Sequence, residues 1–350
     1  MAIIYRTCMH IRSAGLACLA ALALVAMLSA ALAAEPTDLR QLRIVVGTTV
    51  GATYDAYARL IGRHIGNYLP GHPNVIVQNM AGAGGLAAAN YLYNVAPQDG
   101  TMIGIFARGL PTLPLLDSAG VQFDPAQFNW LGSPASEVSL VWAWYTTPFK
   151  TFEDVQQREM IIPATGPGAD SIVFPYVMNA ILGTKFKVVS GYPGGPELLL
   201  AVERGEAEGI ASTSWDNFTS SKQEWVRDGK VRFLLQLGLK KEPAIGDVPL
   251  VLDKAKSAGD RQVLELVFSR NTLAYPIVAP PAVRHERIEL LRAALHQTAQ
   301  DEAFQADAKN ENLALDFVSG AQMTDILHGL YATSPEVIER ARRAVSEGHM

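Results

Sequence analysis

The feature that most constrains this chain is a unit of strand, glycine-containing loop and helix that recurs four times. The loops lie at 48–55, 79–85, 165–171 and 192–196, each between a short apolar run and a helical pattern. Such alternation is typical of α/β folds, because a helix carries the chain back between neighbouring parallel strands. Loops at the carboxyl ends of such strands bind ligands. The sequence therefore predicts an α/β fold with several ligand-binding loops.

The loop at 79–85 is the most informative of the four. An apolar strand at 75–77 enters it, Gly82, Gly84 and Gly85 lie within it, and a helix over 86–95 follows. Small residues allow a ligand to approach the backbone closely. The first N–H groups of a helix have no internal partner, and the helix dipole adds partial positive charge there. We expect an anion at this corner.

Two α/β domains are predicted, because about 316 residues remain after an N-terminal leader and exceed what one core usually fills. We expect strands at 42–47, 75–77, 101–107, 138–145, 160–164, 187–190, 208–211, 231–237 and 272–279, and helices at 55–69, 86–95, 171–182, 196–205, 284–299 and 335–345. We place domain 1 at 35–141 and 272–350, and domain 2 at 142–271.

The N-terminus has the layout of a secretory signal peptide, which we assign to residues 1–34. Arg6 and Arg12 precede an apolar run over 14–28, and small residues at 31–33 suit a cleavage site. The run is short for a membrane-spanning helix, although an uncleaved anchor stays an alternative. The leader predicts a periplasmic protein.

Composition excludes several classes of protein. Cys8 and Cys18 are the only cysteines and both lie in the leader, so the mature chain has no disulfide and no thiol chemistry. Removing Arg6 and Arg12 from the 29 basic residues leaves 27 against 34 acidic residues, a net charge of about −7. No block of like charge stands out, which argues against nucleic acid as a partner.

Motifs for catalysis, metals and cofactors are missing. The sequence contains no Gly-x-Ser-x-Gly and no His-Glu-x-x-His, and His64 on an apolar helical face is better read as a core residue. The loop over 82–87 fits a loose Gly-x-Gly-x-x-Ala dinucleotide motif, but it follows the second strand and no acidic residue follows at the expected place. We therefore expect no catalytic residues, no metal and no cofactor.

Several of these segments resemble one known family, the periplasmic substrate-binding proteins of tripartite tricarboxylate transporters (the TctC/Bug family). The family's Asn-Arg-Pro-Gly-Ala-Gly-Gly is matched by 79–85, and its Ala-Pro-x-Asp-Gly-Tyr-Thr by 96–101. Looser matches lie at 51–59 and 165–171. The resemblance covers nearly the whole mature chain.

The resemblance implies a two-domain type II periplasmic-binding-protein fold, with the ligand cleft between two domains that are each a mainly parallel sheet flanked by helices. It also implies a carboxylated ligand held by backbone N–H groups, and a two-component membrane permease as partner. The chain departs from the family at Met80 and Ala81, which replace Arg and Pro, and its loop over 47–52 lacks proline and paired glycines. We therefore regard it as a divergent member.

The candidate ligand-binding residues come from the four loops and from the ends of neighbouring strands. They are Thr48, Thr49, Tyr54, Asp55, Ala83, Gly84, Gly85, Arg108, Thr165, Gly168, Ala169, Asp170, Ser171, Ser212, Trp215 and Asp216.

The side chains in this set suggest different roles. Arg108 could hold a carboxylate bidentately, or could form an interdomain salt bridge. Tyr54 and Trp215 could pack on the body of a ligand, and Asp216 could bind an amine or cap a helix. The hydroxyl groups of Ser171 and Ser212 could donate hydrogen bonds to a carboxylate.

The sequence thus predicts a monomeric periplasmic receptor that captures a small organic anion, most simply a carboxylate, by closure of its domains. Delivery to a tripartite tricarboxylate-type permease follows from the resemblance. Two alternatives stay open. One is a ligand sensor that docks on a membrane receptor kinase, and the other is a secreted α/β enzyme, against which the missing nucleophile–base motif argues.

Overall fold

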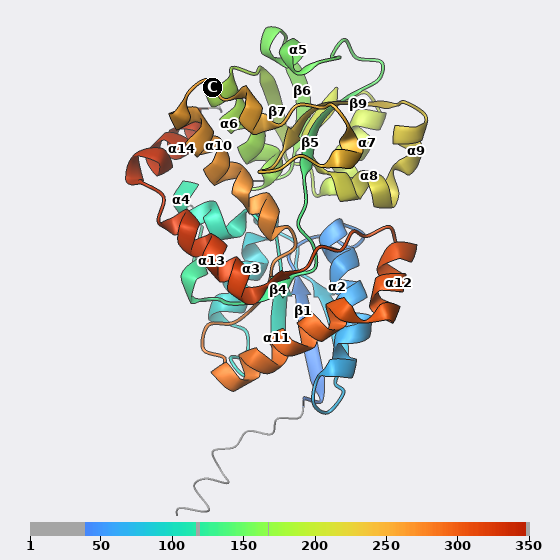
Figure 1. Ribbon diagram of the computed structural model, residues 1–350, viewed down its shortest axis with the longest axis vertical. Coiled ribbons are helices and arrows are strands. Elements are labelled where there is room, and N and C mark those ends of the chain that lie inside the picture. Colours follow the sequence, from blue (N-terminus) through green and yellow to red (C-terminus); the bar gives the residue numbers. More distant parts are fainter. Residues whose placement is uncertain (1–38, 117–119, 167, 348–350) are drawn as a thin grey trace, which may run out of the picture.

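The chain folds into two lobes, which lie one above the other in Figure 1. The computed structural model describes residues 39–116, 120–166 and 168–347. The predicted signal peptide at 1–34, with both cysteines, lies outside the described residues. Within the described part, none of the helices has both the length and the apolar character needed to span a bilayer.

The first lobe is built on a six-stranded mixed sheet in the order β11-β4-β10-β3-β1-β2. The strands are β1 (Gln41–Val46), β2 (Asn74–Asn79), β3 (Met102–Ile105), β4 (Asn129–Ser133), β10 (Ile277–Ala279) and β11 (Val318–Ser319). β1 runs parallel to β2 and β3, and Val46 pairs with both Asn79 and Ile105. The three parallel strands therefore end at one level, which brings the loops that follow them side by side.

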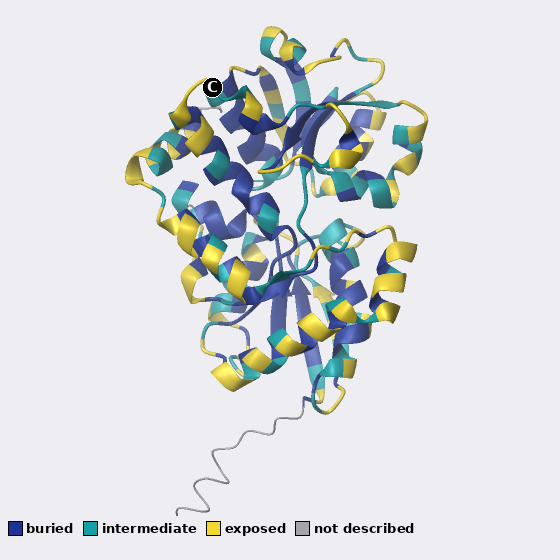
Figure 2. Cartoon of the chain, viewed as in Figure 1, coloured by how far each residue is buried: buried dark blue, intermediate teal, exposed yellow. Residues whose placement is uncertain are grey.

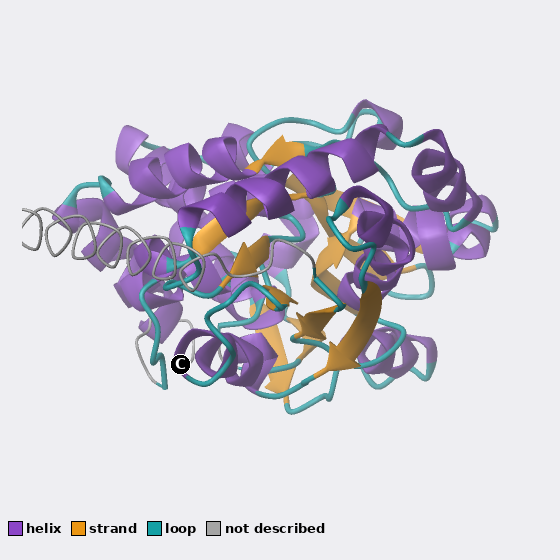
Figure 3. Cartoon of the chain, turned by 90° about the horizontal axis from the view of Figure 1, so that it is seen from below, coloured by secondary structure: helices purple, strands orange, loops and turns teal. Residues whose placement is uncertain are grey.

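Helices surround this sheet, as the view from below shows (Figure 3). They are α2 (Thr53–His64), α3 (Leu86–Asn94), α4 (Leu113–Leu116), α11 (His285–Gln300), α12 (Glu302–Asn310) and α13 (Gly320–Tyr331). Tyr57, Leu60 and Ile61 of α2 are fully buried, as the helical spacing predicts. His64 is also buried, and its Nε2 lies 3.0 Å from an Asp307 carboxylate oxygen, so it belongs to the packing of α2 against α12.

The second lobe contains two smaller sheets. β5 (Ser139–Trp144) lies between β8 (Gly209–Ser214) and β9 (Val231–Leu237) and is antiparallel to both, whereas β6 (Met160–Ala164) and β7 (Phe186–Ser190) are parallel. β8 approaches β5 very closely at Gly209, where an added Cβ would lie 2.0 Å from the Trp142 carbonyl oxygen. Only glycine fits there.

Seven helices among the described residues pack on these sheets or beside them. They are α5 (Phe152–Gln157), α6 (Asp170–Leu182), α7 (Gly195–Glu203), α8 (Trp215–Ser221), α9 (Gln223–Arg227), α10 (Ala258–Phe268) and α14 (Pro335–Glu347). The α6 helix ends at Gly183, whose φ of +69° is the left-handed conformation typical of a helix C-terminus. Figure 1 shows α14 beside α6 and α10.

Within the described residues, the chain crosses between the lobes three times. The crossings are the segments 134–138 after β4, 269–276 before β10 and 332–334 before α14. The predicted domain limit at 271/272 falls within the second crossing, whereas the limit at 141/142 falls beyond the first crossing, inside β5. Both limits stay predictions. The α14 helix, which lies inside predicted domain 1, packs against α6 and α10, because its buried residues Ala341, Ala344 and Val345 join the core there.

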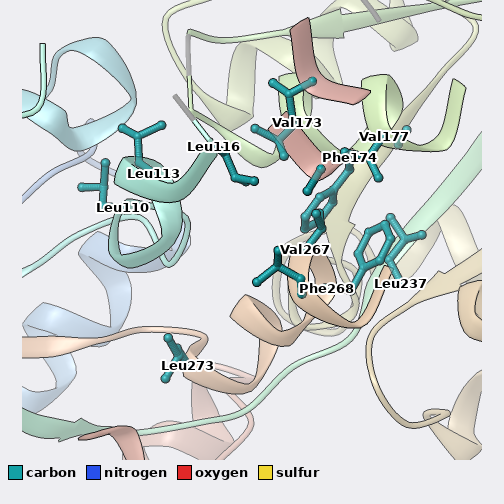
Figure 4. Packing of buried hydrophobic residues seen from close by; sticks show 14 of the residues in the cluster. Leu110, Leu113, Leu116, Val173, Phe174, Val177, Leu237, Val267, Phe268 and Leu273 are labelled. Atoms are coloured by element: carbon teal, nitrogen blue, oxygen red, sulfur yellow. The ribbon is translucent and has the colours of Figure 1, made fainter. Parts of the chain in front are cut away.

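One apolar core continues from lobe to lobe on the side of α4, α6, α10 and α14. Figure 4 shows Phe174 of α6 beside Phe268 of α10, and their ring centroids are 4.7 Å apart. Leu113 and Leu116 of the first lobe belong to the same cluster (Figure 4). Exposed residues gather on outer helices such as α11 and α12 (Figure 2). The lobes are therefore packed together on one side, and any cleft must open on another.

The predicted α/β class with two lobes is confirmed, with mixed rather than mainly parallel strand directions. In the first lobe, the strands β10 and β4 adjoin the crossings, and β10 runs antiparallel to its neighbours. A strand that enters from the other lobe has no crossover helix to reverse it, so it need not follow the parallel direction.

Candidate ligand-binding cleft between the lobes

A cavity of about 930 Å³ lies between the two lobes and is lined by residues from all four predicted loops. On the first lobe these residues come from 47–54 and 81–85, and on the second lobe from 165–171 and 191–200. The N-terminal ends of α2, α3, α6 and α7 all border this space. Four helix N-termini around one cavity give it a positive potential from the backbone alone.

The loop at 82–85 requires glycine. Gly82, Gly84 and Gly85 have φ angles of 150°, 66° and 94°, which side-chain-bearing residues rarely adopt. Ala83, also in the loop, has a φ of 47°. Gly85 is the residue that precedes α3, so the turn directs the first N–H groups of that helix toward the cavity.

Asp55 holds the two first-lobe loops together from behind. Its carboxylate accepts hydrogen bonds from the Gly51 N–H, Arg59 Nε and Asn79 Nδ2, each at 3.0 Å. The Asn79 amide also donates to the Thr48 carbonyl oxygen at 3.0 Å. Although burial alone raises the pKa of Asp55, the hydrogen bonds from Arg59, Gly51 and Asn79 lower it below its usual value. The side chain is 3% exposed and lies outside the cavity lining, so Asp55 positions the loops.

The loops of the two lobes face each other at short range. A Cβ added to Gly166 would lie 3.7 Å from the Gly84 nitrogen, and one added to Gly194 would lie 2.9 Å from Thr49 Oγ1. Gly166 and Gly194 belong to the second lobe, whereas Gly84 and Thr49 belong to the first. The structure therefore has a closed arrangement, in which the loops of both lobes meet over the cavity.

Arg108 lies at the base of the cavity, and its charge is paired with carboxylates of the protein. Its Nε donates to an Asp170 oxygen at 2.7 Å, its Nη1 pairs with Glu137, and its Nη2 donates to Ser139 Oγ at 2.8 Å. Burial by itself lowers the pKa of Arg108, but the nearby Asp170 carboxylate outweighs it, and the pKa lies above its usual value. Of the two roles that the sequence leaves open, the described contacts match the interdomain salt bridge.

Asp170 joins Arg108 to a second buried arginine. Its other oxygen accepts a hydrogen bond from Arg270 Nη1 at 3.1 Å. Arg270 is 1% exposed, and burial lowers its pKa despite this carboxylate. Asp170 begins α6 in the second lobe, Arg108 follows β3 in the first, and Arg270 lies in the crossing segment. The cluster of Arg108, Glu137, Asp170 and Arg270 therefore ties the lobes together at the cleft base.

Tyrosine hydroxyls extend this polar network behind the cleft. The Tyr275 hydroxyl donates to Glu137 Oε2 at 2.5 Å and lies 3.5 Å from Asp216 Oδ2. The Tyr57 hydroxyl lies 2.7 Å from the Ala314 carbonyl oxygen and 3.1 Å from Asp216 Oδ2. Tyr54 donates to the Ala274 carbonyl oxygen at 3.1 Å and accepts from the Arg108 N–H at 3.2 Å. Burial raises the pKa values of Asp216, Tyr57 and Tyr275. These groups link the first lobe, the crossings and the second lobe.

Most of the residues predicted from the sequence line the cavity. They are Thr48, Thr49, Tyr54, Ala83, Gly84, Gly85, Arg108, Thr165, Ala169, Asp170, Ser171 and Ser212. Contact of each with a ligand stays a prediction. The Ser171 hydroxyl accepts the Thr165 N–H at 3.1 Å, which fixes the shape of that loop.

Four predicted residues lie elsewhere, and local geometry explains each placement. Asp55 is turned behind its loop, as described above. Gly168 packs against the first lobe, where a Cβ would lie 2.9 Å from Leu113 Cδ1. Trp215 and Asp216 line a separate cavity of about 660 Å³ on the other side of the crossing at 136–138. At about 100° per helical residue, Ser214 and Asn217 of the same turn face the cleft while Trp215 and Asp216 point away.

Several lining residues were not predicted. Glu137 and Tyr275 come from the crossings, Tyr192 from the loop before α7, and Asn217 and Lys222 from the α8 region. The loop at 192–196 was a sequence signal for Tyr192. The other four have no local signal, because only the path of the chain brings them to the cleft.

The described residues contain no group of three or more His, Cys, Asp or Glu side chains arranged to hold a metal ion. Among the described residues that line the cleft, Thr48 and Asn217 each have a buried oxygen with neither a hydrogen-bond nor an ion-pair partner, namely Oγ1 and Oδ1. Buried polar atoms are rarely left unpaired, so both mark places where a ligand or water can bind.

Comparison in sequence gives one informative relative. No family model matches the chain. It is 25% identical over 247 residues to a UPF0065 protein in the gbd 5′ region of Cupriavidus necator. The aligned part covers 68% of this chain and 72% of that protein.

Solved structures resemble this chain over more of its length than the sequence relative does. The chain is similar to an R. palustris protein solved with adipate, with a TM-score of 0.68, 18% identity and coverage of 88% of this chain and 98% of the other. For MatC from Rhodopseudomonas palustris, solved with bound malate, the TM-score is 0.67 and the identity 20%, with coverage of 89% of this chain and 100% of MatC. For a TctC solute binding protein from Polaromonas, solved with no ligand, the TM-score is 0.61 and the identity 17%, with coverage of 87% of this chain and 99% of the other.

These likenesses define the fold as that of two-lobed periplasmic binding proteins. Within that class, the solved structures that the chain resembles include TctC-type proteins, and the predicted resemblance to the TctC/Bug family is confirmed. The chain covers 97% to 100% of the TctC- and Bug-type structures, so the likeness extends over both lobes.

Proposed function

We propose that this protein is a periplasmic solute-binding receptor that captures a small organic carboxylate by closing its lobes. The observation that carries the proposal is the set of four helix N-termini, with glycine loops from both lobes, around one cavity of about 930 Å³ between the lobes. Backbone N–H groups at helix N-termini suit an anion and need no cationic side chain. In this proposal the protein is a binding protein and not an enzyme.

The paired state of Arg108 determines how the carboxylate is held. Glu137 and Asp170 already compensate the Arg108 charge, so a second anion there would compete with two buried carboxylates. We therefore assign the carboxylate to the loops at 48–54, 82–85 and 165–171. The Thr48 hydroxyl has no partner among the described residues, and we assign it as a donor to this carboxylate.

Relatives of the same fold support the ligand class. One was solved with adipate and another with malate, and both are carboxylates. The leader-like segment at 1–34 supports a periplasmic location, and the resemblance to TctC proteins supports a tripartite tricarboxylate-type permease as the partner that receives the ligand.

Calorimetric titration of ligand-free protein with a panel of carboxylates tests the binding function. We expect at least one carboxylate to bind with a Kd in the micromolar range or below, because a few charge-assisted hydrogen bonds of about 1.5–3 kcal/mol each suffice. The matching carboxamide, which has the same shape without the charge, should not bind. A broad panel with no binding carboxylate, or equal binding of acid and amide, contradicts the proposal.

Replacing Thr48 by valine tests the placement, since it removes the hydroxyl and keeps the shape. We expect a loss of about tenfold in carboxylate affinity. Thr147→Val is the matched control, because the Thr147 hydroxyl donates to the Trp144 carbonyl oxygen away from the cleft and its loss should leave affinity unchanged.

A further inference from the structure

The second cavity, of about 660 Å³, lies behind the ligand cleft on the other side of the crossing at 134–138. The first lobe contributes α12 and the segment after it to the wall, and the second lobe contributes Trp215 and Asp216 of α8. Glu137, whose charge is paired with Arg108, lies in the crossing and lines both cavities. This space, which we call the rear cavity, has a volume typical of small-molecule sites.

Asp216 presents a carboxylate oxygen to the rear cavity that the protein leaves unpaired. The residue is 4% exposed. Its Oδ2 atom lies within reach of the Tyr57 and Tyr275 hydroxyls, whereas its Oδ1 atom has no hydrogen-bond partner among the described residues. No cationic side chain of the described part contacts either oxygen. Because a buried carboxylate is costly without a cation, this one suits a positively charged ligand.

The other charged groups of the rear cavity are mainly acidic. Glu242 and Asp316 line it together with Asp216, whereas Lys309 of α12 is the one cationic residue of the described wall and is exposed. Burial chiefly raises the pKa of Asp216, and the negative charge of Glu242 adds to the effect. A positive charge between these groups would therefore be stabilised by both.

The placement of the carboxylates favours an extended organic cation over a metal ion. Three uncompensated acidic residues line the cavity, yet the described residues contain no group of three that could hold one metal ion. Their charges are spread along the wall, so a cation with two separated charges matches them better. The Trp215 ring lines the same space and suits an alkylammonium chain, because aromatic rings attract both its charge and its apolar body.

We propose that the rear cavity binds a linear organic diamine, with one ammonium group at Asp216 Oδ1 and the other at Glu242. The Glu242 Oε1 atom already accepts the Ala244 N–H at 2.9 Å, so its other oxygen receives the second ammonium group. An ammonium group has three donors and no acceptor, which fits oxygen atoms of this kind. The site is separate from the carboxylate site in the cleft, because the crossing lies between the two cavities.

Titration calorimetry at about pH 8, where carboxylates are ionised, tests the site directly. The probes are butane-diamine and pentane-diamine with terminal amino groups, and butylamine serves as the single-charge comparison. We expect the wild type to bind at least one diamine about tenfold or more tightly than butylamine, because the second ammonium group adds a charge-assisted hydrogen bond. Asp216→Asn, which keeps the shape and removes the charge, should weaken diamine binding by about tenfold or more.

Glu242→Gln is the second variant and should reduce diamine affinity to that of butylamine. Glu159→Gln is the matched control, since it removes the same charge from an exposed ion pair with Lys187 and should leave diamine affinity unchanged. Thermal unfolding of each variant checks that it is folded.

Three results would overturn the proposal. The first is a wild type that binds neither diamine, or binds butylamine equally well. The second is wild-type diamine affinity in Asp216→Asn. The third is an equal loss in Glu159→Gln, which would mean diffuse attraction to an acidic surface rather than a site.

Discussion

At the scale of single residues, Arg108 shows how partners decide the role of a side chain. Its position after β3 at the cleft edge is what the sequence predicts. In the structure, the Arg108 guanidinium forms ion pairs with Glu137 and Asp170, so its charge joins the two lobes. Neither carboxylate is near Arg108 in sequence, so no local pattern could distinguish the ligand-binding role from the structural one.

Arg108→Met should destabilise the protein by about 3–5 kcal/mol, because it leaves the buried Glu137 carboxylate without its cation. The double variant Arg108→Met/Glu137→Gln should lose less than the sum of the two single variants, since it removes both charges of one pair. Urea unfolding measures all three. Lys187→Met, from an exposed pair with Glu159, should cost less than about 1 kcal/mol. Additive losses would contradict a coupled buried pair.

Asp55→Asn should lower the stability at neutral pH by about 1–3 kcal/mol, because the Arg59, Gly51 and Asn79 donors bond to an ionised carboxylate. The folded pKa of Asp55 lies below the value of 3.8 for a free side chain. Its contribution is therefore present above pH 3.8 and is lost as the pH falls through the folded pKa. Unfolding curves of variant and wild type should converge at acidic pH, and a constant difference would argue against this cause.

At the scale of elements, the sequence predicts those whose pattern is strongly periodic. The strands β6 and β9 have the predicted bounds, and α2 has the predicted buried stripe. β4 was not predicted, because its five residues are nearly all buried and give no alternation. α10 was also missed, although Val263, Leu264, Val267 and Phe268 have helical spacing and could have indicated it.

The placement of α14 leads to a prediction about that helix. Ala341 is fully buried where α14 packs against α6 and α10. Ala341→Asp should destabilise the protein by about 3–5 kcal/mol, since it buries a charge without a partner. Arg343→Asp, on the exposed side of the same helix, is the control and should change stability by about 0.5 kcal/mol or less. Equal effects in chemical denaturation would show that α14 does not pack as described.

At the scale of the whole molecule, two features hold the lobes in their closed arrangement. One is the apolar core shared by α4, α6, α10 and α14, and the other is the ion cluster centred on Asp170. The core lies beside the crossings, whereas the cluster lies at the base of the cleft. The ion pairs of Asp170 with Arg108 and Arg270 are thus polar contacts that can separate when the lobes open.

Asp170→Asn should favour an open arrangement, because it leaves the charges of Arg108 and Arg270 facing each other with one carboxylate fewer. Small-angle X-ray scattering should give a larger radius of gyration for the ligand-free variant than for the wild type. A bound carboxylate should reduce the difference, since it favours closure. Glu159→Gln, in an exposed pair, is the control. An unchanged radius in Asp170→Asn would mean that the cluster does not hold the lobes.

The sequence by itself determined the α/β class, the four glycine loops and the likeness to TctC-type proteins, because these depend on local periodicity, on positive φ angles and on short motifs. Only the tertiary structure decided that Arg108 is paired and that Trp215 and Asp216 lie behind the cleft. The reason is physical. Backbone conformation is set by neighbours in the chain, whereas charge pairing and burial are set by residues far apart in the sequence that the fold brings into contact.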